Sequence, residues 1–493
     1  MEIIKENKKK ILSYMEKVAM VILLSVMSIV TFLSAEQLTQ VKIDQYAWGG
    51  IMLFFCALLI SFRLNLKNRY IYITGILYAI LFLLYTLHTG YIKYEHEWLK
   101  VLFCKGMVYG ILVLMATDAA TKKRFCRFKE LDLVKIGSAV VTCVAIHIVP
   151  NGILDKAIPV AFVICTFIIF EKDRTESFLV CYSWANIIGA TTIALWSLIT
   201  HPYAGERRYY GAFTYLHGFG MYIGSGIVCC IFLIMYVRIK HWNKKRLLVS
   251  VIPFLLALLY AFVLINSRGA LLGVVAAIIV FVVLLSKVTG KKRLIGRISL
   301  VVVIAVFLLG GVVVYLGIFY DRYKTWLEKV PLLSYMATTV QRTIKAKSRT
   351  GIFPDGTILT AIDRFTSSRL SIWKVTVENL KWFKGNSMWI TVSDWTTGTH
   401  NTYLGFLNGF GIVVGGLFIV LLFYVFIKAI KIVKADTSNG VALFTVFWYA
   451  FSLLIFINEM VYFSGYYMIL CLFALGVLRD NKSIGVEAEN VPQ

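Results

Sequence analysis

One histidine and four arginines are the residues of this chain whose surroundings suggest chemistry. His400 stands in T-H-N-T-Y-L-G-F-L-N-G-F-G-I, where a long polar segment ends and an apolar run begins. Arg207 and Arg208 precede an earlier apolar run, Arg268 begins another, and Arg369 lies within the polar segment. At the start of a helix, the dipole lowers the pKa of a histidine and favours the neutral imidazole, which a general base requires. The histidine therefore suggests proton transfer beside several fixed cations.

Each of these residues also has a purely structural interpretation. An arginine at the end of a membrane span is commonly an interfacial anchor, and a histidine there commonly caps a helix. Arg268 is the most unusual, because it is the sole basic residue of its loop and lies between the small residues Ser267 and Gly269. Arg369 opens a predicted helix, where the dipole disfavours a cation. The other histidines have no metal-ligand spacing, so we expect no metal site.

The elements that hold these residues are membrane spans. Of the 493 residues, 59% are hydrophobic and 16% are charged, and the mean hydropathy is +0.77. Apolar runs of about 20 residues, the length needed to cross a bilayer, recur along the chain. We predict an all-α, polytopic helical membrane protein with about 12–14 transmembrane helices and one large extracytoplasmic loop. The first run follows a basic start and is interpreted as a retained signal anchor.

The predicted spans number about fourteen. The pair at 133–150 and 153–170 has an alternative interpretation as a re-entrant hairpin, because Pro150 and Asn151 join its halves. The full set is roughly 18–36, 47–62, 69–88, 98–117, 133–150, 153–170, 177–199, 212–237, 247–265, 268–286, 297–319, 402–430, 440–457 and 459–478.

Lysine and arginine set the predicted orientation. They are concentrated in alternate short loops, for example Lys122–Arg124 and Lys244–Arg246, which the positive-inside rule places in the cytoplasm. Both termini are then cytoplasmic, and the segment 320–400 faces outward. The predicted parts are a bundle at 1–319, the outer loop at 320–400, C-terminal spans at 401–480 and a tail at 481–493. The net charge of +25 reflects this topology and anionic lipid rather than nucleic acid.

The outer loop is the soluble part large enough to hold a site. The inner loops are short, and no G-x-x-x-x-G-K-[ST] phosphate loop is present, so a cytoplasmic nucleotide site is not expected. Within the outer loop we predict two helices. One carries an amphipathic stripe from Tyr320 to Val330. The other starts near Ser367 with Leu370, Trp373, Val377 and Leu380 on one side and ends at Gly385 and Asn386.

Four G-x-x-x-G pairs lie beside the polar motifs, and such pairs permit close helix contact. The general interpretation is ordinary membrane packing. If the contacts join the eighth, tenth and twelfth spans, the arginines and His400 share one outward pocket. The pairs are Gly220/Gly224, Gly269/Gly273, Gly405/Gly409 and Gly411/Gly415.

Three motifs together resemble those of the O-antigen ligase and O-antigen polymerase superfamily. They are N-S-R-G-A-L-L-G, T-S-S-R-L-S-I-W, and H-N-T-Y-L-G-F-L-N-G-F-G-I, and R-Y-Y-G-A-F-T-Y-L-H-G-F-G is similar to that family's earlier arginine motif. The resemblance runs from about residue 207 to 422. It implies a metal-independent GT-C glycosyltransferase without cofactors, in the bacterial cytoplasmic membrane, acting on undecaprenyl-pyrophosphate-linked glycan at the outer face.

Carried over residue by residue, the resemblance implies specific roles. Arg208 (or its neighbour Arg207), Arg268 and Arg369 would bind the pyrophosphate of the donor, and His400 would act on the acceptor hydroxyl. Asn401 and Tyr403 would support it. Guanidinium groups match phosphate oxygens in geometry and charge. Implied partners are the lipid-linked glycan and membrane lipids, with a chain-length regulator and a flippase as further candidates.

The motifs leave the exact activity open. A polymerase of capsule or other envelope polysaccharide and a ligase that transfers finished glycan to a lipid or wall acceptor share them. The span count exceeds that of typical ligases and favours a polymerase. From another class, a transporter or flippase of lipid-linked glycan would also use arginines, but it should show internal repeats and polar groups near the bilayer midplane.

Overall fold

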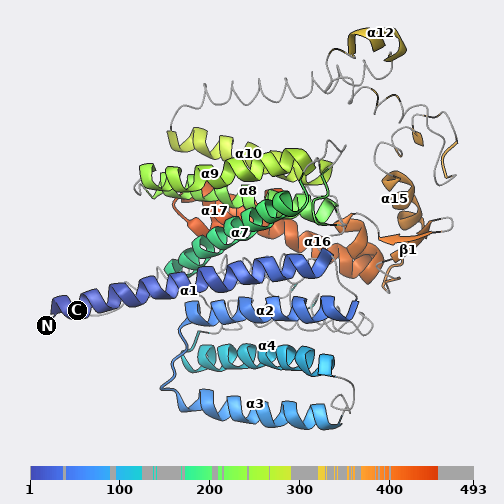
Figure 1. Cartoon of the computed structure of the whole chain (residues 1–493). Helices are drawn as coiled ribbons and strands as arrows, with labels where there is room; N and C mark the ends of the chain where they lie inside the picture. The colour runs from blue at the N-terminus through green and yellow to red at the C-terminus, as the bar shows by residue number, and fades with distance from the viewer. Residues whose placement is uncertain are drawn as a thin grey trace. The chain divides into compact units, whose positions relative to one another are not determined.

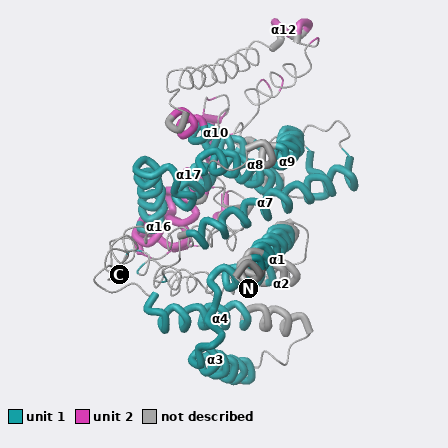
Figure 2. Tube along the Cα trace, turned by 90° about the vertical axis from the view of Figure 1, so that its left-hand side faces the viewer, with its two compact units in different colours: residues 1–281, 417–455, 459–493 teal, residues 282–416, 456–458 magenta. Residues whose placement is uncertain are grey.

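The computed structural model describes the chain over a series of stretches separated by gaps. The described stretches are 2–36, 40–88, 96–124, 172–202, 209–213, 216–240, 244–265, 267–289, 320–327, 352–354, 359–360, 368–383, 385–386, 389–392, 395–398 and 401–453, with a few single residues between them. The chain divides into two compact units, coloured separately in Figure 2. Unit 1 comprises residues 1–281, 417–455 and 459–493, and unit 2 comprises residues 282–416 and 456–458.

Unit 1 begins with four helices packed side by side in the order α1, α2, α4, α3 (Figure 1). Their bounds are α1 Glu2–Glu36, α2 Gln40–Phe62, α3 Arg69–His88 and α4 His96–Thr121. Helix α3 is apolar, yet only 11% of its membrane-length window is buried within the protein. Such a surface is stable only against lipid or another apolar surface.

The second group of helices in unit 1 forms its most buried part. Helix α7 packs against α1, α8, α9 and α17, and α8 lies at the centre, with 94% of its apolar window buried. The bounds are α7 Lys172–Thr200, α8 Leu216–Ile239, α9 Lys244–Ile265, α10 Arg268–Thr289 and α17 Gly440–Leu453. Buried hydroxyls of Ser28 and Tyr222 lie 2.6 Å apart, and the Asn186 amide donates to Ser225 Oγ at 2.9 Å, so α1, α7 and α8 also share a polar contact line.

These helices confirm the membrane class and many of the predicted spans. Within the described residues, six helices are long and apolar enough to cross a bilayer, and four shorter apolar helices accompany them. All of them overlap predicted spans. The predicted spans at 153–170, 297–319 and 459–478, and nearly all of 133–150, lie outside the described residues.

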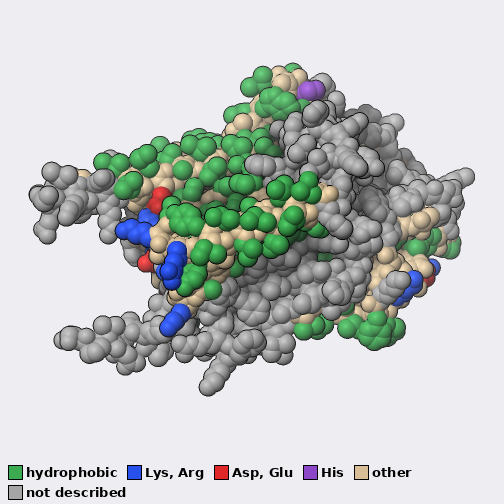
Figure 3. Space-filling model, turned by 90° about the horizontal axis from the view of Figure 1, so that it is seen from below, with side chains coloured by type: hydrophobic (Ala, Val, Ile, Leu, Met, Phe, Trp, Pro, Cys, Tyr) green, Lys and Arg blue, Asp and Glu red, His purple; other side chains and the backbone are tan. Residues whose placement is uncertain are grey.

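One end of unit 1 gathers segments that are distant in sequence. The Arg63 guanidinium binds the Glu16 carboxylate, Asn65 N–H donates to Asp118 Oδ1 at 3.2 Å, and Arg174 donates to the Ser61 carbonyl at 3.3 Å. Figure 3 shows lysine and arginine side chains grouped beside a largely apolar surface. Consecutive helices therefore alternate in direction, as a bundle of membrane spans requires.

Between α10 and α16, the described residues of unit 2 include two short helices and a β-hairpin. The elements are α12 Tyr320–Leu327, α15 Arg369–Glu378, β1 Trp389–Val392 and β2 Trp395–Gly398. The strands pair antiparallel, with Trp389 opposite Gly398 and Val392 opposite Trp395. The prediction of an outer loop made of helices alone is therefore wrong at 389–398, where aromatic and β-branched residues favour strands.

Helix α15 has one buried face. Ser371, Ile372 and Thr376 are buried, whereas Val377 is 55% exposed. Ile372 packs with Ile390 and Val392 of the hairpin in a small apolar cluster. Of the residues expected on one side of the helix, Trp373 is partly buried against this cluster.

Candidate functional site

The motif that contains His400 forms the start of helix α16, which spans Thr402–Ala435. Asn401 is 7% exposed, and its Oδ1 accepts hydrogen bonds from the N–H groups of Tyr403 at 2.9 Å and Leu404 at 3.1 Å. This is the geometry of an N-cap, which satisfies amide groups that the first helical turn leaves unpaired. His400 itself lies outside the described residues. Its sequence position is directly before the cap, and the half-buried Tyr403 lies in the first turn.

Helix α16 contains a sharp break at Gly411. This residue has φ 84° and ψ 162°, a conformation that essentially only glycine adopts. An unbroken helix of this length would extend about 51 Å, well beyond the roughly 30 Å of a bilayer core. After the break, Gly415 lies against the backbone of Phe406: a Cβ on Gly415 would be 2.5 Å from the Phe406 carbonyl oxygen. Residues nine apart in a straight helix are about 13 Å apart, so the chain folds back on itself.

A segment of the preceding loop fills the break. The N–H groups of Ile412 and Val413 donate to the carbonyls of Lys381 and Trp382 at 2.8 Å and 3.0 Å. In return, Asn386 N–H donates to the Asn408 carbonyl at 2.7 Å. The break therefore loses few backbone hydrogen bonds, because residues 381–386 replace the helix's own partners.

Side chains and a glycine complete this contact. The Asn386 amide donates to Asn408 Oδ1 at 3.1 Å and to the Asn379 carbonyl at 2.6 Å, joining the end of α15 to α16. A Cβ on Gly385 would overlap the Gly409 carbonyl. The glycines and asparagine of the L-N-G-F-G-I motif therefore have a structural role: they allow the loop backbone to approach the helix. Gly411 and Gly415 are both at close contacts, but Gly411 lies against the backbone of Lys381, Trp382 and Phe383 and Gly415 against Phe406 of its own helix.

Arg369 begins α15, and a buried carboxylate explains how that helix starts. Asp363 is 2% exposed and accepts hydrogen bonds from Ser371 N–H at 2.7 Å and Ser371 Oγ at 2.8 Å. A negative charge at a helix N-terminus offsets the dipole that disfavours a cation there. Ser368, the residue before the helix, makes no side-chain cap bond and has φ 65°.

The arginine-bearing segments of unit 1 meet through their described neighbours. Tyr209, which directly follows Arg207 and Arg208, donates its N–H to the Leu264 carbonyl at 3.1 Å, four residues before Arg268. Helix α10 begins at Arg268, whose side chain lies outside the described residues, as do Arg207 and Arg208. The structure thus brings the two motif segments together but does not place their guanidinium groups.

Tyr209 fixes the first of these segments to the end of α7. Its hydroxyl donates to the His201 carbonyl at 2.7 Å and lies 3.2 Å from Ser197 Oγ. Burial raises the pKa of the Tyr209 phenol, so the group stays neutral and holds these hydrogen bonds. Ser197 Oγ also accepts from Ala212 N–H at 3.1 Å. A short polar clamp, not foreseen from the sequence, thus sets the approach of the R-Y-Y-G-A-F segment.

The two glycines Gly220 and Gly224 of α8 lie at close contacts with other segments, as the small-residue spacing predicts. A Cβ on Gly220 would overlap the Ser267 side chain, and one on Gly224 would lie 3.1 Å from Phe451 and 3.3 Å from Val274. Gly220 therefore allows α8 to approach Ser267, directly before α10, and Gly224 allows it to approach α17 and one residue of α10, whereas the main packing partners of α8 are α7, α9 and α17. Among the described residues, no group of three His, Cys, Asp or Glu side chains is arranged to hold a metal ion.

Comparisons of the chain with protein-family models, with curated proteins and with solved structures give no match.

Proposed function

We propose that this protein is a polysaccharide polymerase that joins undecaprenyl-pyrophosphate-linked repeat units at the outer face of the cytoplasmic membrane. Its motifs resemble those of the O-antigen ligase and polymerase superfamily. The observation that carries the proposal is the hydrogen bond from Tyr209 to Leu264, because it holds the R-R-Y-Y and N-S-R-G segments against each other. Together these neighbouring segments carry three arginines, whose guanidinium groups suit an anionic leaving group.

In the proposed reaction, an acceptor sugar hydroxyl attacks the anomeric carbon of the donor glycan. A new carbon–oxygen bond forms, the bond between the anomeric carbon and the pyrophosphate oxygen breaks, and undecaprenyl pyrophosphate leaves. His400 accepts the hydroxyl proton. Arg208 or Arg207, Arg268 and Arg369 stabilise the charge that develops on the leaving group. The donor already holds the bond energy, so the reaction consumes no cytoplasmic nucleotide.

The geometry at the start of α16 supports the role given to His400. Asn401 caps the helix through its own side chain, so residue 400 adjoins the positive end of the helix dipole. A neutral imidazole is favoured there, and that form accepts a proton. Transfer of a finished glycan to a lipid or wall acceptor would use the same groups and remains the alternative activity.

A transporter of lipid-linked glycan is a second candidate, and one observation favours it. The break in α16 resembles the discontinuous helices around which transporters build their sites. Against it, the buried contact line of Ser28, Asn186 and Tyr222 contains no carboxylate, lysine or histidine. Elongation of a lipid-linked repeat unit by purified protein in detergent would exclude a transporter, since detergent leaves no compartments.

The decisive experiment measures glycan attached to the donor lipid in cells that carry single substitutions. We expect His400→Ala and Arg268→Ala to leave single repeat units on the lipid, with polymer reduced at least about 100-fold, as loss of a general base or charge stabiliser usually does. Arg69→Ala is the matched control, because Arg69 begins the apolar helix α3 as Arg268 begins α10. Long unattached chains would instead identify a ligase, and normal polymer in both variants would overturn the proposal.

A further inference from the structure

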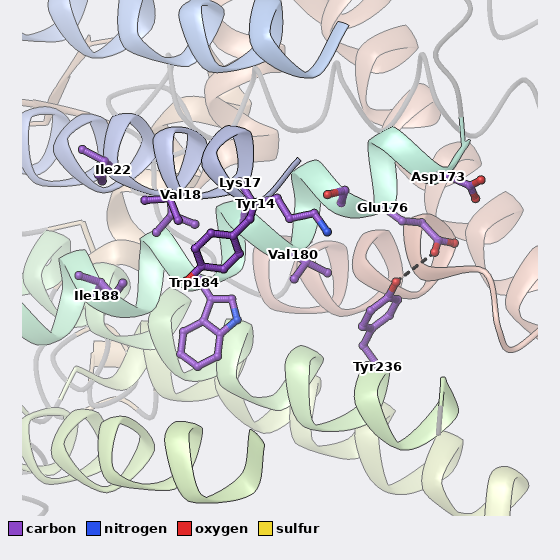
Figure 4. Close-up of a pocket in the computed structure, with 13 residues that line it drawn as sticks. Tyr14, Lys17, Val18, Ile22, Asp173, Glu176, Val180, Trp184, Ile188 and Tyr236 are labelled. Carbon is purple, nitrogen blue, oxygen red and sulfur yellow. Dashed lines mark hydrogen bonds between the residues drawn. The ribbon is translucent and has the colours of Figure 1, made fainter. Parts of the chain in front are cut away.

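A cavity of about 670 Å³ lies in unit 1 between α1 and α7, and none of the proposed catalytic residues lines it. Tyr14, Lys17 and Ile22 line it from α1, and Asp173 and Trp184 line it from α7. Its volume lies in the range of small-molecule pockets. Figure 4 shows that its two ends differ in character.

The polar end holds two charges that are available to a ligand. Figure 4 shows the Lys17 ammonium directed toward the end occupied by Asp173 and Glu176. Glu176 is already engaged, because it binds Lys240 at 3.0 Å, the Tyr236 hydroxyl at 3.1 Å and Gly440 N–H at 2.9 Å. Within the described part of the chain, Lys17 and Asp173 have neither a hydrogen bond nor an ion pair. The cavity thus presents one free cation and one free anion.

The other end is apolar and open to the surroundings of the bundle. Val18, Ile22 and Ile188 lie there, on the side away from Asp173 (Figure 4). Tyr14 and Ile22 line the cavity and are nevertheless 70% and 57% exposed, so the cavity is open beside α1. In a membrane-spanning protein these side chains face lipid. An occupant that enters from the bilayer would place a hydrocarbon chain against this end and its headgroup at the charges.

We propose that this cavity binds a phospholipid with a zwitterionic headgroup, of the phosphoethanolamine type. The headgroup phosphate pairs with Lys17, the headgroup ammonium pairs with Asp173, and an acyl chain lies along Ile22 and Ile188. An anionic phospholipid would bring its phosphate to Lys17 but would leave Asp173 without a cation. Charge complementarity therefore selects the zwitterion, and this selection does not depend on the proposed polymerase activity.

Native mass spectrometry of the purified full chain in detergent tests this. Phosphatidylethanolamine and phosphatidylglycerol with identical acyl chains are added in equal amounts, and the bound lipid is counted. One additional charge pair corresponds to about a fivefold preference, so phosphatidylethanolamine should dominate by that factor. Equal binding of the two lipids, which a non-selective lipid layer would give, would overturn the proposal. So would a preference for phosphatidylglycerol. Both outcomes can be observed with the unmodified protein.

Substitutions at the two charges locate the site. Lys17→Gln and Asp173→Asn should each reduce the preference for phosphatidylethanolamine about fivefold, and Asp173→Lys should shift it toward phosphatidylglycerol. Ile22→Trp fills the apolar end and should weaken both lipids equally. Lys67→Gln and Glu378→Gln, at exposed positions that do not line the cavity, serve as charge-matched controls.

A preference that persists unchanged in both Lys17→Gln and Asp173→Asn would place the lipid elsewhere and contradict the proposal. Size-exclusion chromatography identifies any variant that fails to fold. The competition on the unmodified protein then still decides for or against a zwitterionic site.

Discussion

Helices α8 and α16 both contain the spacing G-x-x-x-G, but its glycines have different structural roles in the two helices. Helix α8 continues unbroken from Leu216 to Ile239, and its Gly220 and Gly224 admit side chains of other helices. In α16, Gly411 breaks the helix and Gly415 lets the chain fold back on Phe406. The spacing G-x-x-x-G therefore indicates close approach of backbones without specifying the partner.

The two helices also differ in how they satisfy their backbone hydrogen bonds. A continuous helix such as α8 pairs its own amides, and its glycines affect packing alone. Helix α16 depends on Lys381, Trp382 and Asn386 for three backbone bonds at its break. Substitutions at glycine in α16 should therefore disturb hydrogen bonding as well as packing, and should be the more damaging.

The largest effect should follow from Gly385→Ala. The added methyl would overlap the Gly409 carbonyl, which cannot move without opening the bonds between residues 381–386 and α16. We expect the free energy of unfolding to fall by about 3 kcal/mol or more, read as a lower apparent Tm in detergent. An apparent Tm unchanged to well within 1 °C, which for a chain of this length corresponds to less than about 1 kcal/mol, would mean that the segment does not dock as described.

Two neighbouring glycines of α16 distinguish the effect of a close contact on stability from the effect of helix propensity. Gly415→Ala places a methyl against the Phe406 carbonyl and should cost about 2 kcal/mol. Gly416→Ala adds the same methyl where nothing lies within 4 Å, so it should be neutral or stabilise by up to about 1 kcal/mol. Equal apparent Tm values for the two variants would indicate a straight α16.

The smallest effect is expected in α8, where a side chain can yield. Gly220→Ala should cost about 1–2 kcal/mol, because its methyl would meet the Ser267 side chain. Adding Ser267→Gly should recover most of the loss, since it removes that side chain. Thermal unfolding of both single variants and the double variant gives the coupling. Additive losses would show that α8 and α10 do not meet at this point.

Much of the membrane architecture could be predicted from the sequence, because lipid requires long apolar helices with paired backbones. The break at Gly411 could not, since L-N-G-F-G-I-V-V remains apolar across it and the replacing carbonyls come from the loop before it. The hairpin at 389–398 carried a local signal in its aromatic and β-branched residues. The cap of α15 did not, because Asp363 lies eight residues before the amide that it accepts from.

The candidate site could be predicted from the sequence less completely than the membrane architecture. The motif around Tyr209 and the one around Arg268 do come together, because the bond to Leu264 joins their segments. Asn401 proves to be a cap, which the motif H-N-T permits but does not specify. The structure does not describe the side chains of His400, Arg207, Arg208 and Arg268, and Arg369 lies in a different unit from the other arginines. The catalytic roles of these residues therefore remain predictions.

The dependence of α16 on residues 381–386 limits how this part of the molecule moves. Releasing the segment would leave the N–H groups of Ile412 and Val413 and the Asn408 carbonyl unpaired in apolar surroundings. At about 2 kcal/mol for each group, the released state would be populated at roughly one part in 10⁴. We therefore expect Lys381, Trp382 and Asn386 to stay bound to α16 while other parts of the molecule move.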